Sequence, residues 1–392
     1  MPRVLFVVSA NLAGHPPNGP RKDYRVLAEV LGASVIDYAA VEGSDSLRRL
    51  ARVVGTPVAQ AWRAFRRRHE FDAILTDGEH IGIPLALLLK LSGSRVPHVT
   101  IGHRITAAKK RPFFRWLKVQ THIARIALHA RRQHELGIAE LGIAPEKLAL
   151  VPYQVDTDFW CPQAVPEERL ICSAGLEFRD YPTLVAAVSD LDVRVVIGAA
   201  SHWSKRRNTA ADVAPPANVT VDAFDYQGLR RLYARSAVVV VPLDDTDFQA
   251  GVTTILEAMA MAKPVIVSHS QGQTDVVQDR RTITRGASPR ARPSSLLSSL
   301  ADATDVKLEP SGFYVPPGDS AALQRAIVYL LDHPEERQRL GAAGRRAVER
   351  LTTVDQYATR LRQLVHEAVQ EFQTQPGTPR RRVLGAVTAG TE

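Results

Sequence analysis

The sequence contains only two cysteines, Cys161 and Cys172. Two thiols are too few for a disulfide framework or a four-thiolate zinc site, so we expect a reducing, cytoplasmic location. The chain also lacks any apolar run of the roughly 18 residues that a membrane-spanning helix requires. The apolar stretch from Val4 to Val8 follows a single basic residue, Arg3, and fits a buried first strand better than a signal peptide. The composition therefore excludes a small disulfide scaffold and an integral membrane protein.

The length and the charge of the chain narrow its class further. Its 392 residues exceed what one hydrophobic core usually encloses, which predicts two domains with a cleft between them. The net charge of +9 predicts an anionic partner, such as nucleotide phosphates, a nucleic acid or a membrane surface. Because the cations are dispersed and no nucleic-acid-binding module is recognisable, we expect no nucleic acid partner.

Two series of short apolar runs indicate the fold class. In both series β-rich runs alternate with segments of helical spacing, the helix expected at residues 24–31 being one example. The strands of the first series are expected at residues 4–8, 34–36 and 73–75, and those of the second at 170–174, 193–197, 219–221, 237–241 and 264–267. This alternation predicts an α/β protein with two Rossmann-like, doubly wound domains.

Composition places the domain boundaries. We expect an N-terminal domain over residues 1–155 and a C-terminal domain over 165–350, joined by a segment bracketed by prolines. Within the second domain, residues 280–310 are rich in Arg, Ser, Pro and Ala. We interpret them as an insertion with one short helix at 294–301. Two long helical patterns, at 321–331 and 354–372, are expected to finish the fold, followed by a disordered tail at 374–392.

Residues 241–267 carry the strongest chemical signal. A buried strand leads into a polar loop, and a helix opens at Gly251 before a second strand. The backbone amides of Gly251, Val252 and Thr253, together with the helix dipole, form an anion site suited to a diphosphate. Glu257 lies among apolar neighbours in the same helix, where a carboxylate needs donors such as ribose hydroxyls or a structural partner.

The same segment resembles the C-terminal signature of the GT-B glycosyltransferases of family 4, the group 1 glycosyl transferases. In that signature two acids, separated by seven positions, face the donor sugar and the ribose. Glu257 matches the second acid, but Gln249 stands in place of the first. An amide can bind sugar hydroxyls, yet it brings no negative charge to an oxocarbenium-like transition state. Residues 148–159 and 312–331 also resemble family segments, so the resemblance covers nearly the whole chain.

The resemblance implies a fold and an activity. Two Rossmann-like lobes would face a central cleft, and a helix over residues 351–373 would cross back to the N-terminal lobe. The protein would be a hexosyltransferase that uses a nucleotide diphosphate sugar, retains the anomeric configuration and needs neither a metal nor a cofactor. The acceptor stays open between a lipid-linked molecule, a glycan and a small molecule. Two alternatives also stay open, namely a sugar-nucleotide-binding protein with impaired catalysis and a nucleotide-sugar epimerase, which the order of the motifs disfavours.

The resemblance also assigns the cations of the donor site. Arg179 matches a Lys or Arg that neutralises the donor diphosphate as it departs. Leu176 stands where the family has a preceding Arg, so one cation of the usual pair is missing. Lys205 or Arg206 is expected to supply the missing charge, unless both belong to a solvated basic run.

Two residues of the N-terminal part match family positions. Gly14 lies in the loop after the first strand and is the best match to the family's glycine-containing loop, although such a loop can also be a plain strand-to-helix connection. His103 follows the strand at residues 99–101 and resembles the histidine that contacts the transferred sugar. Without the resemblance, a lone histidine is more often structural or solvated.

Two further motifs have competing interpretations. The segment from Lys109 to Lys118 mixes cations with aromatic residues, which fits either a peripheral patch at the inner membrane face or a core helix with a solvated basic face. Asp245 and Asp247 spell an acid-x-acid motif that another glycosyltransferase fold uses to hold a divalent metal. Here the motif precedes the donor-site helix, so we expect a role in the loop rather than a metal site.

Overall fold

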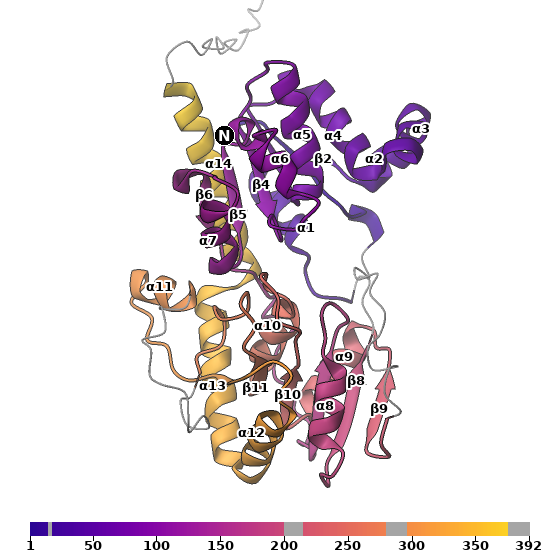
Figure 1. Ribbon diagram of the computed structural model, residues 1–392, viewed down its shortest axis with the longest axis vertical. Helices are drawn as coiled ribbons and strands as arrows, with labels where there is room; N and C mark the ends of the chain where they lie inside the picture. The colour runs from indigo at the N-terminus through magenta and orange to yellow at the C-terminus, as the bar shows by residue number, and fades with distance from the viewer. Residues whose placement is uncertain (15–17, 200–214, 280–295, 375–392) are drawn as a thin grey trace, which may run out of the picture.

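The computed structural model describes residues 1–14, 18–199, 215–279 and 296–374. The described chain forms two domains stacked along the long axis of the molecule, each built on a six-stranded parallel sheet (Figure 1). The strands of the N-terminal sheet are β1 (Val4–Val7), β2 (Ser34–Ile36), β3 (Ala73–Thr76), β4 (His98–Gly102), β5 (Arg125–Leu128) and β6 (Leu148–Leu150). Those of the C-terminal sheet are β7 (Leu170–Ala174), β8 (Arg194–Gly198), β9 (Val219–Asp222), β10 (Val238–Val241), β11 (Val265–Ser268) and β12 (Gly312–Val315).

Helices connect the strands and cover both sheets. The helices of the N-terminal domain are α1 (Asp23–Leu31), α2 (Tyr38–Glu42), α3 (Asp45–Val54), α4 (Thr56–Arg67), α5 (Glu79–Leu91), α6 (Arg111–Arg115) and α7 (Arg131–Ala139), with short 3₁₀ turns η1 (Leu12–Gly14), η2 (Arg68–Glu70), η3 (Val119–His122) and η4 (Pro145–Lys147). Those that follow β7 are α8 (Tyr181–Val188), α9 (Tyr226–Arg235), α10 (Val252–Ala260), α11 (Leu296–Ala303), α12 (Ser320–Asp332), α13 (Pro334–Leu351) and α14 (Val354–Thr374). Aspartate side chains cap α8, α9 and α12, because each accepts a hydrogen bond from a backbone amide of the first turn.

The strand order of each sheet indicates where a ligand would bind. The N-terminal sheet runs β2-β1-β3-β4-β5-β6, and the C-terminal sheet runs β12-β11-β10-β7-β8-β9. The order therefore reverses between β1 and β3 in one sheet and between β7 and β10 in the other. In open parallel sheets, ligands bind at the carboxyl ends of the strands where the order reverses. The predicted α/β class with two doubly wound domains is confirmed.

The chain crosses between the domains twice, at neighbouring positions. The backbone amide of Val155 donates to the carbonyl oxygen of Thr352 (2.9 Å). The segment that leaves the N-terminal domain and the segment that returns to it therefore lie side by side. After the second crossing, α14 packs along the N-terminal domain (Figure 1). Its buried residues Tyr357 and Leu361 share one hydrophobic core with Phe6 of β1. The predicted return of the last helix to the N-terminal lobe is confirmed.

The end of the C-terminal domain differs from the expectation. Three long helices complete the fold, because the 18-residue helix α13 lies between the two that were expected. Small residues make up much of its buried face, including Gly341, Ala343, Gly344 and Ala347, so larger apolar side chains such as Leu340 are too sparse in its sequence to mark a helix. Of the expected insertion, α11 and the segment after it are described; residues 280–295, and the expected tail from residue 375, lie outside the described residues.

Candidate active site

A cavity of about 390 Å³ lies between the two domains, at the carboxyl ends of both sheets. The N-terminal domain lines it with Ser9, Asp77 and His103, which follow β1, β3 and β4. The C-terminal domain lines it with residues that follow β7 and with residues of α10. Both positions where the strand order reverses therefore contribute to one cavity, as expected for a ligand site in this class of fold.

Arg179 forms part of the C-terminal wall of the cavity and is only 4% exposed. Its guanidinium donates to the carbonyl oxygens of Ala174 (2.9 Å) and Glu177 (2.8 Å) and to the hydroxyl of Thr254 in α10 (3.0 Å). Burial lowers the pKa of Arg179 from its ordinary value of 12.5. Because a guanidinium keeps its proton in proteins, a buried positive charge is fixed at the edge of the cavity.

Two glycines make room for this guanidinium. A Cβ at Gly175 would lie 2.6 Å from Nη2 of Arg179, and a Cβ at Gly251 would lie 3.2 Å from Nη1. Both glycines also have positive φ angles, +96° at Gly175 and +76° at Gly251, which side-chain-bearing residues rarely adopt. Gly251 is the residue that precedes α10, so the arginine lies directly beside the amino end of that helix.

Glu257 lies six residues after Gly251, in the second turn of α10, and is 8% exposed. Its Oε2 accepts a hydrogen bond from the hydroxyl of Tyr233 in α9 (3.1 Å). Burial raises the pKa of Glu257 to about 7, although the Tyr233 hydrogen bond and the charges of Lys22 and Arg179 act in the opposite direction. Because one hydrogen bond does not satisfy a carboxylate, Glu257 can accept further donors from a ligand in the cavity.

The N-terminal wall is organised around Glu79, the first residue of α5. Its buried carboxylate accepts the backbone amides of His103 and Arg104 (3.0 Å each) and pairs with Lys110. Burial raises the pKa of Glu79, but the charges of Lys110 and His103 and these hydrogen bonds outweigh burial and hold the pKa at about 2. The imidazole of His103 donates from Nε2 to the carbonyl oxygen of Asp77 (3.0 Å). Glu79 thus fixes the loop that carries His103 into the cavity.

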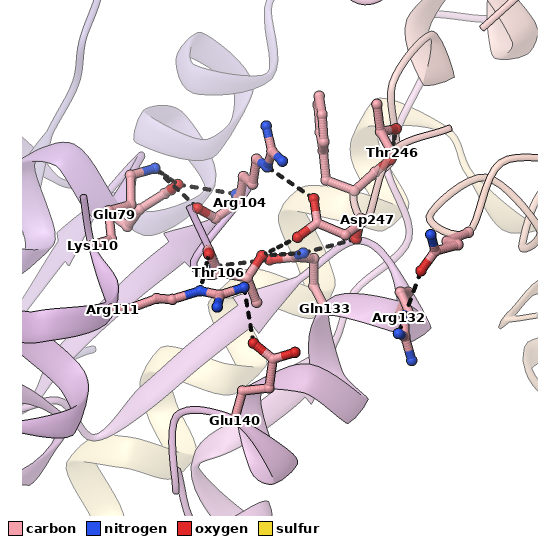
Figure 2. A network of polar contacts seen from close by, with 12 residues as sticks. Glu79, Arg104, Thr106, Lys110, Arg111, Arg132, Gln133, Glu140, Thr246 and Asp247 are labelled. Atoms are coloured by element: carbon pink, nitrogen blue, oxygen red, sulfur yellow. Dashed lines mark hydrogen bonds and ion pairs between the residues drawn. The ribbon is translucent and has the colours of Figure 1, made fainter. Parts of the chain in front are cut away.

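A polar network joins this loop to the C-terminal domain, and Figure 2 shows it around Asp247. The Asp247 carboxylate accepts the hydroxyl of Thr106 (2.6 Å) and forms an ion pair with Arg104 (2.9 Å). Its carbonyl oxygen accepts the amide of Gln133 (2.8 Å), which also donates to Thr106. The Arg104 guanidinium lies over the ring of Phe248 at 4.9 Å. The network therefore holds the two walls of the cavity at a fixed separation.

The structure brings together five of the residues that the sequence selected. His103, Arg179, Gly251, Thr253 and Glu257 all line the cavity. Leu176, at the position of the missing cation, lines it as well, whereas Lys205 and Arg206 lie outside the described residues.

Three other selected residues do not line the cavity. Gly14 belongs to η1, and the side chain of Val252 is buried in the core of the C-terminal domain. Gln249 lines a separate hollow of about 10 Å³ together with Asp275 and Leu297. Its contact with a donor sugar stays a prediction.

The structure also shows the surroundings of the acid-x-acid motif and of the basic–aromatic segment. Asp245 accepts the backbone amide and the side-chain amide of Gln271, within the C-terminal domain. Among the described residues, no group of three His, Cys, Asp or Glu side chains is arranged to hold a metal ion. In the basic–aromatic segment, Phe114 is buried in the core, whereas Trp116 is 78% exposed. A search of the described helices for one that could span a membrane finds none.

Several cavity residues were not selected from the sequence. Asp23, the first residue of α1, and Asp77, directly after β3, both line the N-terminal wall. Lys22 reaches across the cavity, where its ammonium donates to the hydroxyl of Tyr226 (2.7 Å). Asp77 is the first charged residue after a buried strand, a pattern that could have identified it. Lys22 and Asp23 carry no such signal, because they follow a loop whose path the sequence does not determine.

Comparison with known proteins identifies the fold and a family match over part of the chain. Residues 178–333 match the model of a family described as glycosyl transferases group 1. No curated protein matches the sequence of the chain. Among solved structures, the chain is similar to sucrose-phosphate synthase from Thermosynechococcus elongatus, with 18% identity and a TM-score of 0.66 over 94% of this chain and 100% of that one.

Two further solved structures are similar over nearly the same length. The HepE protein of Anabaena, solved in complex with UDP-glucose, has 13% identity and a TM-score of 0.64 over 95% of this chain and 100% of that one. An α,α-trehalose-phosphate synthase from Burkholderia xenovorans, solved with glucose-6-phosphate, has 11% identity and a TM-score of 0.60 over 93% and 100%. The chain therefore has the GT-B fold of glycosyltransferases. The match over residues 178–333 and this fold together support a relationship of the chain to the group 1 glycosyltransferases.

Proposed function

We propose that this protein is a glycosyltransferase of the family 4 type, which moves a hexosyl group from a nucleotide diphosphate sugar to an acceptor hydroxyl. The observation that carries the proposal is the convergence of a buried arginine, a helix amino end and a buried carboxylate on one wall of the interdomain cavity. Arg179 and the amides at Gly251 and Thr253 match a diphosphate, and Glu257 matches a ribose diol. Neighbours of the same fold solved with UDP-glucose make this donor class the first to test.

The proposed reaction needs little covalent chemistry from the protein. The bond between the anomeric carbon and the diphosphate oxygen breaks, a bond to the acceptor oxygen forms, and the acceptor proton passes to the departing diphosphate. Arg179 and the amino end of α10 stabilise the charge that develops on the diphosphate, and we assign this task to them rather than to a metal. Because the acceptor would attack from the side of the leaving group, we propose that the anomeric configuration is retained.

Donor binding provides the direct test. Thermal unfolding of the purified protein is measured with each of a panel of uridine, guanosine and adenosine diphosphate sugars. In a separate assay with the same donors, release of the nucleoside diphosphate is followed. One donor at a hundred times its Kd should stabilise the fold by about 3 kcal/mol. In Glu257→Ala this stabilisation should disappear, while Glu335→Ala, an exposed position on α13, should keep it. An absence of response to every donor would contradict a transferase.

Two further measurements separate the finer parts of the proposal. The anomeric configuration of the product, read by NMR from the coupling of the anomeric proton, should equal that of the donor. Donor binding without any release of nucleoside diphosphate would favour the binding protein with impaired catalysis, for which Leu176 in the cavity wall is the structural argument. Conversion of the donor into an epimer of itself would favour the epimerase.

A peripheral membrane contact is a separate part of the proposal. Trp116 and Leu117 are exposed beside the exposed cations Arg115 and Lys118, a combination that suits an anionic lipid surface on the cytoplasmic side. Wild-type protein should sediment with vesicles that contain phosphatidylglycerol, and Trp116→Ala should reduce the bound fraction. Trp62→Ala serves as the control, since Trp62 is only 37% exposed and lies under Arg66. Equal sedimentation of both variants would remove Trp116 from the contact.

A further inference from the structure

The N-terminal wall of the cavity carries two carboxylates that the proposed donor chemistry does not use. Asp77 lies between β3 and α5, and its Oδ2 accepts the backbone amide (2.6 Å) and the hydroxyl (2.9 Å) of Ser9. Its other oxygen, Oδ1, is buried and has no hydrogen-bond partner among the described residues. Asp23 lies at the start of α1 and lines the same wall, and its charge raises the pKa of Asp77, whereas the charge of His103 lowers the pKa of both. A buried carboxylate oxygen without a donor is costly unless a ligand supplies one.

The lysine and arginine side chains of the described cavity lining are already engaged on both walls. The cation Arg179 and the amino end of α10 lie on the C-terminal wall, where the diphosphate is proposed to bind. On the opposite wall, Arg21 is already engaged with the carboxylates of Asp156, Asp158 and Asp355. The only other fixed cation among the described N-terminal lining residues is Lys22, which extends to Tyr226 on the C-terminal side. Neither Asp23 nor Asp77, which line the N-terminal wall, forms an ion pair with another described residue.

Burial favours the neutral form of both carboxyl groups. It raises the pKa of Asp77 and of Asp23, while hydrogen bonds from backbone amides and the charge of His103 oppose the rise in both. Whether ionised or sharing a proton, two carboxyl groups in a partly dry site favour ligands that donate hydrogen bonds. A fully ionised phosphate ester placed against them has no hydrogen to donate to Oδ1 of Asp77, and it meets like charge at whichever carboxyl group is ionised.

We propose that Asp23 and Asp77 select the acceptor: they bind hydroxyl groups of an unphosphorylated, polyhydroxylated acceptor and reject acceptors that carry a phosphate beside the reacting hydroxyl. The inference rests on the proposed function, because it takes the C-terminal wall to hold the donor. Oδ1 of Asp77 is the acceptor atom for one substrate hydroxyl, while Oδ2 stays with Ser9. Asp23, the first residue of α1, is the second carboxyl group that binds acceptor hydroxyls.

The test uses matched acceptor pairs with the donor that stabilises the full-length protein. Glucose and glucose 6-phosphate, and mannose and mannose 6-phosphate, are compared by release of nucleoside diphosphate and by calorimetric titration into protein saturated with the nucleoside diphosphate. In wild type the unphosphorylated member of each pair should bind at least tenfold more tightly. In Asp77→Asn and Asp23→Asn this preference should fall at least tenfold, with the Kd for the donor unchanged. Asn at position 77 still accepts from Ser9, so folding is preserved, and melting curves verify it.

A control and two contrary outcomes complete the experiment. Asp72→Asn should behave as wild type, because Asp72 lies at the opposite end of β3, where it accepts the backbone amide of Arg3. Tighter binding of the phosphorylated member to wild type, or an unchanged preference in both Asn variants, would overturn the acceptor assignment while donor binding stands. Failure of every donor to bind would instead overturn the proposed function, and the acceptor assignment with it.

Discussion

Tyr233 donates its hydroxyl hydrogen to Oε2 of Glu257 across 3.1 Å, and both side chains are buried, with Glu257 lining the cavity. The hydrogen bond joins α9 to α10, so the carboxylate is oriented before any ligand arrives. Burial nevertheless raises the pKa of Glu257 to about 7. The carboxyl group is therefore near its midpoint of ionisation at neutral pH, where small changes in pH alter its capacity to accept hydrogen bonds.

The first prediction concerns the pH dependence of donor affinity. An ionised Glu257 can accept both ribose hydroxyls, whereas the protonated form has lost acceptor capacity. Affinity for a diphosphate sugar, whose own phosphates do not titrate in this range, should rise about tenfold between pH 6 and pH 8. Calorimetry at pH 6, 7 and 8 measures the rise. Glu257→Gln should bind weakly and show no such step, and an equal step in that variant would assign it to another group.

The same residue predicts the sign of a stability change. The folded pKa of about 7 exceeds the ordinary value of 4.5, so the fold favours the protonated form. The stabilisation is fully present below pH 4.5 and is lost as pH rises through 7, by about 3 kcal/mol relative to Glu257→Gln. Tyr233→Phe removes a hydrogen bond that lowers the pKa, so the loss should continue to a higher pH in that variant. Urea unfolding across the pH range measures both effects.

The second prediction tests the space that Gly251 leaves for Arg179. A Cβ at Gly251 would lie 2.8 Å from Val241 and 3.2 Å from the guanidinium, at a φ of +76°. Gly318 has nearly the same φ, +74°, but nothing within 4 Å of its Cβ position. Gly318→Ala should therefore cost only the backbone strain, about 1 kcal/mol, and Gly251→Ala about 1–3 kcal/mol more from crowding. Gly251→Ala should also lower kcat with donor, because its Cβ would crowd the Arg179 guanidinium. Equal losses of stability and of kcat in both variants would show that Arg179 is not displaced.

The sequence predicted the scaffold of the site better than its details. The apolar strands and the glycine that opens α10 are local signals, so the fold class and the positions of Gly251 and Glu257 followed from them. The orientation of Gln249 depends on how the loop before α10 packs against α11, which involves residues distant in sequence. Asp23 and Lys22 reach the cavity only because α1 begins at its edge, and local spacing does not contain that information.

The third prediction concerns the contacts that hold the two domains together. Asp247→Asn keeps the size of the side chain but removes its charge, which weakens the pairing with Arg104 and Thr106 of the N-terminal domain. Loss of a partly exposed, charge-assisted pairing should cost about 1 kcal/mol and raise KM for donor and acceptor several-fold. Small-angle scattering should report a wider separation of the domains. Asp245→Asn is the control, since within the described part of the chain Asp245 accepts hydrogen bonds from Gln271 of its own domain. A similar expansion in that variant would contradict the bridging role of Asp247.

The fourth prediction decides whether Gln249 acts on the donor sugar. Its side chain is 8% exposed and lines the small hollow beside Asp275, a buried carboxyl group whose pKa burial raises. Gln249→Glu would add a second carboxyl group there, so it should destabilise the fold by about 1–3 kcal/mol at pH 8. At pH 5 the added group would be largely protonated, because burial and Asp275 raise its pKa, and the destabilisation should shrink. Gln249→Met, of similar size and without charge, should show no such pH dependence. An increase of turnover in Gln249→Glu would contradict this placement and indicate that the side chain reaches the donor sugar during the reaction.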